Sequence, residues 1–325
     1  MFSNKPSFYN ALTAAPVSSQ QDLIDGLLAS SAHCSPKYFY NPLGSTLFDA
    51  ITLLPEYYLT RTEAAIFCEH AQAIHAQIPD RAAWIDLGAG SCEKAARLFE
   101  RSPPGLYVAV DISLTYLMDT LERLQREHPS VPMVGVGMDF SSTLTFAPEL
   151  QAQLFAHPVF AFYPGSSLGN FDPVQALAFL KRIVSVCQAA KPGSGLLIGI
   201  DLVKDSAILE RAYADDLGVT AAFNLNLLRH INTIIGTNFD VRDWQHFAHF
   251  NAKESRIEMH LEARREVTVS WPDQKRVFQK GETIHTENSY KWTVKKFSEL
   301  LSSAGFTQTQ HWTDQDAQYA VFWAS

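Results

Sequence analysis

The chain has 325 residues, of which 46% are hydrophobic and 18% are charged, which suits one large globular domain or two moderate ones. Its 26 Lys and Arg against 34 Asp and Glu give a net charge of −8. The charges are interspersed without a basic stripe, so we expect no nucleic-acid partner. No apolar run is long enough to span a membrane, and residues 1–22 lack the basic-then-apolar layout of a signal peptide. We therefore expect a cytoplasmic protein without a membrane partner. We also expect a monomer, although nothing in the sequence addresses the oligomeric state.

Residues with metal-ligand chemistry are scattered along the sequence. The four cysteines form no CxxC pair, which argues against a structural zinc site and against a disulfide framework; they are Cys34, Cys68, Cys92 and Cys187. His246 and His249 lie three residues apart in WQHFAHF and could form a metal pair, but no acidic residue at ligand spacing accompanies them. We therefore interpret both histidines as structural and expect no metal.

The predicted elements change in kind near residue 83. Before it, amphipathic stretches at 21–31 and 62–78 predict helices. An aromatic, turn-rich segment at 38–63 lies between these stretches and overlaps the start of the second. After it, short apolar runs alternate with helical segments such as 92–102 and 114–128, which predicts a parallel sheet covered by helices on both faces. The predicted strands lie within 82–90, 106–113, 131–140, 158–170 and 194–203.

The pattern changes again after Asp201. Residues 205–236 predict helices, and 240–290 contain alternating, strand-like pieces. A helix at 294–304 then leads to two short strands within 307–314 and 318–324. A closing hairpin after five β–α units is typical of the class I methyltransferase fold, whereas ordinary dinucleotide-binding domains end with another parallel strand.

The first predicted strand ends in the glycine loop DLGAGSCEK at 86–94. Gly88 and Gly90 allow a tight turn and a close approach to a ligand, and Asp111 follows at about the distance of a ribose-binding acid. Alone, such a loop fits a plain strand–turn–helix equally well. A dinucleotide site prefers a third glycine, but Glu93 and Lys94 stand at the two candidate positions, whereas Asp139 and Phe140 after the third strand could bind adenine. Together these features favour S-adenosylmethionine as the cofactor.

The fourth predicted strand runs into FYPGSSLGNF at 162–171. In this fold that position faces the methyl donor, so groups that contact the substrate belong there. The amide of Asn170 offers both donors and acceptors, which suits an α-amino-carboxylate. The alternative is that Asn170 caps the next helix.

With these motifs the sequence resembles the histidine-specific methyltransferases, which make hercynine (Nα,Nα,Nα-trimethylhistidine) for ergothioneine biosynthesis. The resemblance covers nearly the whole chain in ordered blocks, at 38–63, 86–94, 165–171, 201–205, 212–228, 256–261 and 281–292. It implies an α/β fold with a class I (Rossmann-like) methyltransferase sheet and a C-terminal antiparallel hairpin, formed by 61–201 and 292–325. It also implies a second, α+β substrate-binding domain, formed by 10–60 and 202–291, with L-histidine bound in the cleft between the two domains.

The resemblance assigns roles to individual residues, none of them a catalytic acid or base. The cofactor-binding set is Tyr40, Gly88, Lys94, Asp111, Asp139 and Phe140. The substrate-binding set is Tyr57 and Gly165 at the amino group, Asn170 and Tyr213 at the carboxylate, Glu287 and Ser289 at the imidazole, and Met259 beside the ring. Tyr40, Tyr57 and Asn170 would position the reactants. The one departure noted is Asn41-Pro42, where the family has Asp followed by a residue other than proline.

Without the resemblance, the substrate residues have ordinary interpretations. Met259 would be core, Glu287 a solvated carboxylate and Ser289 a turn residue. Two alternatives stay open beside a histidine methyltransferase. They are a relative that methylates another amino acid such as a tryptophan derivative, and a catalytically silent relative that binds S-adenosylmethionine. A nicotinamide-dependent dehydrogenase is excluded by the loop spacing and the closing hairpin. The Glu287/Ser289 pair, which can bind the two imidazole nitrogens, favours histidine.

Overall fold

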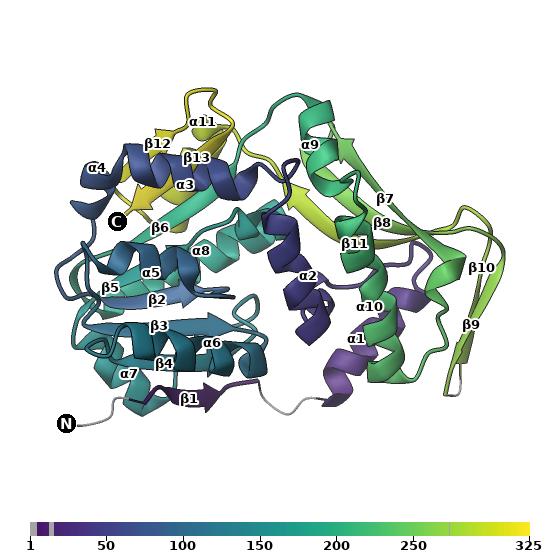
Figure 1. Ribbon diagram of the computed structural model, residues 1–325, viewed down its shortest axis with the longest axis horizontal. Coiled ribbons are helices and arrows are strands. Elements are labelled where there is room, and N and C mark those ends of the chain that lie inside the picture. The colour runs from purple at the N-terminus through teal and green to yellow at the C-terminus, as the bar shows by residue number, and fades with distance from the viewer. Residues whose placement is uncertain (1–4, 13–15, 273) are drawn as a thin grey trace. The chain divides into compact units, whose positions relative to one another are not determined.

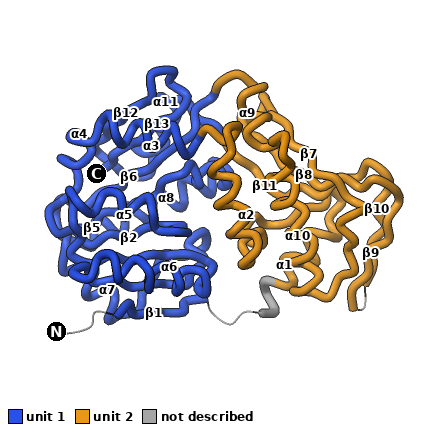
Figure 2. The backbone as a smooth tube through the Cα atoms, viewed as in Figure 1, with its two compact units in different colours: residues 1–13, 59–203, 291–325 blue, residues 14–58, 204–290 orange. Residues whose placement is uncertain are grey.

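The computed structural model describes residues 5–12, 16–272 and 274–325. The chain divides into two compact units (Figure 2). Unit 1 comprises residues 1–13, 59–203 and 291–325, and unit 2 comprises 14–58 and 204–290. Within the described ranges no helix is both long and apolar enough to cross a membrane. Residues 1–4 and 13–15 of the segment considered as a signal peptide lie outside these ranges.

Unit 1 is built on one eight-stranded sheet (Figure 1). In spatial order its strands are β1 (Ser7–Asn10), β4 (Met133–Gly137), β3 (Leu106–Asp111), β2 (Ala83–Leu87), β5 (Pro158–Tyr163), β6 (Lys191–Asp201), β13 (Tyr319–Ala324) and β12 (Thr309–Thr313). The strands from β1 to β6 are parallel, and β13 and β12 form the closing antiparallel hairpin. The predicted class I methyltransferase sheet is therefore confirmed.

Strand β1 corrects the prediction that the first part of the chain is only helical or looped. It pairs in parallel with β4, from Ser7 opposite Val134 to Asn10 opposite Gly137. Gly135 makes room for it, because a Cβ there would lie 2.6 Å from the ring of Phe8. The sequence SFYN does not alternate strictly between polar and apolar residues, so this edge strand has no period-two signal of its own.

Helices cover both faces of this sheet. They are α3 (Leu59–Glu69), α4 (Ala71–His75), α5 (Glu93–Phe99), α6 (Leu114–Glu127), α7 (Pro148–Phe155), α8 (Pro173–Ala189) and α11 (Val294–Ala304), with the 3₁₀ helix η2 (Ser167–Asn170). Helices α3, α5 and α6 lie on one face and α7, α8 and α11 on the other (Figure 1). The single helix predicted at 62–78 is wrong, since His70, with φ −105° and ψ 19°, separates α3 from α4. The helix predicted at 294–304 is confirmed.

The core of the sheet is aromatic around β2 and β5. Every residue of β2 is buried, and Trp84 packs its ring 4.4 Å from that of Phe160 and in an edge contact 5.4 Å from that of Phe99. Burial on both faces explains why these strands read as continuous apolar runs. It also holds the carboxyl ends of β2, β3, β4 and β5 at one edge, where the predicted motifs follow.

Unit 2 combines helices with antiparallel strands. Its helices are α1 (Pro16–Leu28), η1 (Pro36–Phe39), α2 (Pro42–Thr52), α9 (Ser206–Tyr213), α10 (Val219–Ile235) and η3 (Val241–Asp243). Its strands are β7 (Trp244–Asn251), β8 (Arg256–Ala263) and β11 (Thr283–Tyr290) in one sheet, and β9 (Val267–Trp271) and β10 (Gln274–Phe278) in another. Helices α9 and α10 pack on the three-stranded sheet.

Helix α2 forms inside the segment predicted to be turn-rich. Asn41 is its N-cap and its side chain accepts a hydrogen bond from the Gly44 amide at 2.8 Å, and Pro42 occupies the first turn. The amide of Asn226 also donates to the Asn41 side chain, at 2.9 Å. The Asn-Pro departure from the family pattern therefore starts helix α2.

Candidate functional site

The glycine loop after β2 turns tightly against the end of β3. Gly88 and Gly90 have φ of +68° and +49°, a region that side chains disfavour. The Gly90 amide donates to one Asp111 carboxylate oxygen at 3.0 Å, and the Ser113 amide donates to the other at 2.9 Å. The structure thus brings the loop and Asp111 together, with the carboxylate oriented by backbone amides.

Below this loop lies a buried acid that the sequence interpretation did not use. Asp86 is 2% exposed and accepts a hydrogen bond of 2.6 Å from the Tyr107 hydroxyl. Burial raises the pKa of the Asp86 carboxyl to about 7, although the Tyr107 hydrogen bond acts in the opposite direction. Asp86 is thus a buried carboxyl with a raised pKa that precedes the glycines of the loop.

Asp139 and Phe140 follow β4 at the same edge. The Asp139 carboxylate accepts hydrogen bonds from the Ser141 amide, at 3.2 Å, and from the Ser141 hydroxyl. Phe140 contacts Tyr163 edge-on, with ring centroids 5.8 Å apart. A Cβ on Gly88 would lie 3.7 Å from the Phe140 ring, so a larger residue at position 88 would cover it. These features fit an adenine ring against Phe140 and a ribose near Asp111.

Glu63 links helix α5 to the loop after β5, and the sequence interpretation missed it. This carboxylate is 1% exposed. It accepts hydrogen bonds from Lys94 Nζ at 2.6 Å, from the Gly165 amide at 2.7 Å and from the Tyr319 hydroxyl at 2.7 Å. Its place in the block 38–63 was a signal, but its partners lie 31, 102 and 256 residues away.

The loop after β5 has a strained, well-anchored backbone. Gly165 and Ser166 both have positive φ, +81° and +60°, and the Ser166 hydroxyl accepts from the Asp201 amide at 2.8 Å. The Asp201 carboxylate pairs with Lys291 Nζ at 2.8 Å, and both side chains are fully buried. Non-glycine residues with positive φ, such as Ser166, are enriched at functional sites.

Asn170 ends η2 in this loop. The alternative that it caps the next helix is wrong, because α8 is capped by Asp172, whose side chain accepts from the amides of Val174 and Gln175. The Asn170 amide has no hydrogen-bond partner in the part of the chain that the structure describes, and the residue is partly exposed. Its donors and acceptors are thus available to a ligand.

In unit 2, a β-bulge brings three predicted substrate residues to one sheet face. The register between β11 and β8 shifts between His285 and Glu287, so that Glu287 pairs with Met259 and Ser289 with Ile257. Without the shift, Glu287 and Ser289 would share the face of His285 instead. Bulges commonly re-aim side chains at functional sites.

Tyr213 and Ser289 are in direct contact. Their hydroxyls are 2.7 Å apart, and both residues are buried. Tyr57 lies beside them, with its ring centroid 6.2 Å from that of Tyr213. Tyr57 also contacts Phe48, which in turn contacts Tyr40 at 5.9 Å. Unit 2 therefore holds its predicted residues in one connected group.

His246 hydrogen-bonds the backbone of Tyr213. One imidazole nitrogen, Nε2, donates to the Tyr213 carbonyl at 2.7 Å, and Nδ1 accepts from the Asn224 amide at 2.8 Å. Burial lowers the pKa of His246, which keeps the imidazole neutral. The interpretation of His246 as structural agrees with these contacts.

His246 and His249 do not form a pair. They are three apart on β7 and so point to opposite sheet faces. The statement that no acidic residue accompanies them is wrong for His249, because Glu258 of β8 lies directly opposite, with His260 beside it. Sequence spacing along one strand could not show a neighbour on the next strand.

The sheet with its closing hairpin, the glycine turn and the acid at the end of β3 define a class I S-adenosylmethionine-dependent methyltransferase. A family model described as histidine-specific methyltransferase, SAM-dependent, matches residues 19–325. The chain belongs to this family.

Curated relatives resemble the chain over most of its length. It is 37% identical to the histidine N-alpha-methyltransferase of Mycobacterium tuberculosis over 312 residues, which covers 93% of each chain. It is 35% identical to the enzyme of the same name from Mycolicibacterium smegmatis, with 96% of each chain covered. It is 32% identical to the ergothioneine biosynthesis protein 1 of Neurospora crassa, with 84% of this chain and 31% of that protein covered.

Proposed function

We propose that this enzyme transfers methyl groups from S-adenosylmethionine to the α-amino group of L-histidine, three times, to give hercynine in the first step of ergothioneine biosynthesis. The observation that carries the proposal is the group on one sheet face of unit 2, where Glu287 and Ser289 accompany Met259 and the buried Tyr213–Ser289 contact. Relatives with the histidine N-alpha-methyltransferase name support it.

In this proposal the imidazole is bound by Glu287 and Ser289. Neutral histidine has one donor and one acceptor nitrogen, and a carboxylate can accept while a hydroxyl adapts to the other. Met259 packs beside the ring. Amino acids without those nitrogens would leave buried polar groups unpaired. This discriminates between substrates more strongly than the fit of an apolar pocket does.

The α-amino-carboxylate is bound by Asn170 and Tyr213, with Tyr57 and Gly165 at the amino group. Gly165 matters for space, because a Cβ there would lie 3.0 Å from Lys94 Nζ, and the product carries three methyl groups. The Glu63 hydrogen bonds to Lys94 and the Gly165 amide fix both positions together.

The cofactor is bound by Gly88, Lys94, Asp111, Asp139 and Phe140, together with Tyr40. When bound it supplies an electrophilic methyl group on a sulfonium. The remaining work of the protein is to hold an amine lone pair about 3 Å from that carbon and in line with the bond that breaks. The amine must lose a proton before attack, and we propose that water or a path through a tyrosine hydroxyl accepts it.

Mass spectrometry of the purified protein with S-adenosylmethionine and each of the twenty amino acids tests the proposal. Trimethylated histidine alone is the expected product. Methylation of another amino acid, for example tryptophan, would keep the fold and the cofactor but overturn the assignment of Glu287 and Ser289. A monomeric state and a cytoplasmic location stay proposals of the same kind, to be tested by light scattering and by fractionation.

A further inference from the structure

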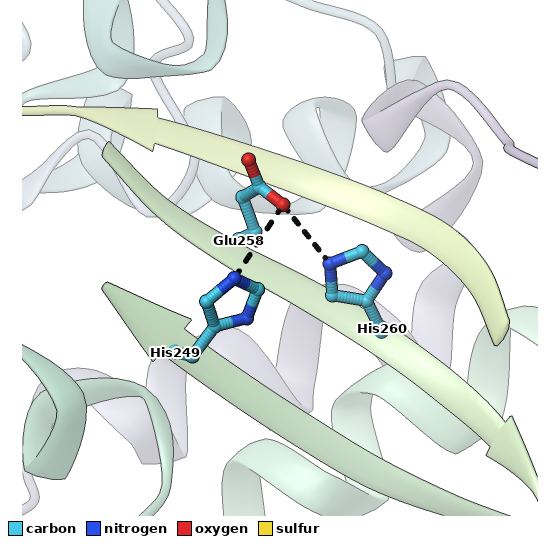
Figure 3. A group of neighbouring side chains, drawn as sticks. All are labelled: His249, Glu258 and His260. Carbon is cyan, nitrogen blue, oxygen red and sulfur yellow. Dashed lines mark hydrogen bonds and ion pairs between the residues drawn. The ribbon is translucent and has the colours of Figure 1, made fainter. Parts of the chain in front are cut away.

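The three-stranded sheet of unit 2 carries a second group of polar side chains, on the face opposite the one that carries Met259 and Ser289. Strand register places His249 of β7 directly across from Glu258 of β8, and His260 two residues further along β8 on the same side. Figure 3 shows the two imidazoles converging on one carboxylate. The proposed histidine site does not use these residues.

The ligand atoms of this group have the spacing of a metal site. Nε2 of His260 lies 3.2 Å from Glu258 Oε2, and Nε2 of His249 lies 3.8 Å from the same oxygen (Figure 3). One ligand atom from each residue lies within 4.8 Å of the other two. Atoms bound at about 2.0–2.2 Å around a tetrahedral ion are about 3.4 Å apart, so small side-chain shifts complete the geometry.

The carboxylate is prepared for this role by its other oxygen. Asn251 Nδ2 donates to Glu258 Oε1 at 2.9 Å, and Arg256 donates to the same atom through Nε at 2.8 Å and NH2 at 2.7 Å. Such outer hydrogen bonds orient metal-ligating carboxylates. They leave Oε2 directed at the two imidazoles. The Arg256 charge opposes a cation, so it lowers the affinity relative to a site without it.

We propose that His249, Glu258 and His260 bind one Zn²⁺ ion. Two imidazoles and one carboxylate, with solvent in the remaining position, are a ligand set that zinc adopts in proteins. The ion links β7 to β8 and stiffens the sheet whose other face bears Met259, Glu287 and Ser289. The site is independent of the proposed reaction, because the methyl transfer proposed above needs no metal.

The test is calorimetric titration of the purified, metal-stripped protein with Zn²⁺, repeated with Co²⁺ while its visible absorption is recorded. The expected result is saturable binding of one ion, a Co²⁺ spectrum of low coordination number, and a thermal unfolding midpoint raised by zinc. His260→Gln should weaken binding at least tenfold, on the order of the loss caused by disturbing a metal's ligand environment.

Two further variants separate binding from folding. His249→Gln changes a side chain that is 37% exposed, so it should lose zinc affinity while its unfolding midpoint without metal stays that of the parent. His311→Gln, at an exposed histidine of β12, is the matched control and should bind zinc like the parent. No saturable binding by the parent, or binding that survives in both His249→Gln and His260→Gln, would overturn the proposal.

Discussion

The two units present their proposed site residues in different ways. In unit 1 the residues follow the ends of parallel strands, each within a short motif, and backbone amides such as that of Gly90 orient them. In unit 2 they come from separate helices and from two antiparallel strands, and a bulge in β11 decides which side chains share a face. A cofactor site common to a fold can thus be local in sequence, whereas a site for one particular substrate is assembled from distant parts.

The largest expected effect is on the buried ion pair of unit 1. Lys291→Met leaves the fully buried Asp201 carboxylate without its cation, and we expect a loss of about 3–5 kcal/mol in the free energy of unfolding. The double variant Asp201→Asn/Lys291→Met should recover much of that loss. Urea denaturation measures both. A single variant that costs less than about 1 kcal/mol would contradict a stabilising role for this buried pair.

The pH dependence of stability should carry the signature of Asp86. Its folded-state pKa is raised from 3.8 to about 7, so between these values the folded state binds more protons than the unfolded state. The free energy of unfolding therefore falls as the pH rises through this window, by up to about 4 kcal/mol. Asp86→Asn should remove this slope in denaturation series from pH 4 to pH 8. An unchanged slope in the variant would contradict the assignment.

Asn170→Ala tests the link between the loop of unit 1 and the substrate. Loss of hydrogen bonds to a charged carboxylate, worth about 1.5–3 kcal/mol, should lower kcat/KM for histidine about ten- to hundredfold. The dissociation constant for S-adenosylmethionine should not change. The control is Val174→Ala, a residue 78% exposed at the start of α8, which should behave like the parent. An unaltered kcat/KM in Asn170→Ala would remove this residue from the site.

Glu63→Gln should have a smaller effect, and on the cofactor. The variant keeps the shape of the side chain but loses its negative charge. That charge pairs with Lys94, and it strengthens the hydrogen bond that the carboxylate accepts from the Gly165 amide. We expect binding of S-adenosylmethionine to weaken about tenfold, in the range for a charge-assisted hydrogen bond. Calorimetry measures it. Binding at the parental affinity would mean that Glu63 only supports the fold.

Sequence patterns predicted the kinds of element in both units, including the helices within 205–236 and the strands within 240–290, but they missed features that depend on distant partners. In unit 1 each buried strand and each strand of the closing hairpin is a short apolar run that can be recognised by itself. Helix α11 has both a Thr293 cap and a Gly305 end signal. Strand β1, the Glu63 contacts and the Asp201–Lys291 pair depend on partners far away in the chain. In unit 2, the aromatic and turn-forming residues of 38–63 led us to predict a turn-rich segment where helix α2 forms.

The bulge in β11 and the group around Glu258 could not be predicted from the sequence either. A bulge adds one residue to one strand, and nothing in TIHTENSY marks where it falls. His249 was compared with a neighbour along its own strand, while its contacts lie across the sheet. The roles of Glu287 and Ser289 followed from the resemblance to a family, and they stay predictions.

The central claim is that unit 2 recognises histidine through Glu287 while unit 1 binds the methyl donor. Calorimetric titration of Glu287→Gln with histidine and, separately, with S-adenosylmethionine tests it most directly, with Glu262→Gln of β8 as the control. The account predicts that histidine binding weakens at least tenfold while cofactor binding matches that of the parent and of the control. Unchanged histidine binding, or an equal loss for both ligands, would contradict it.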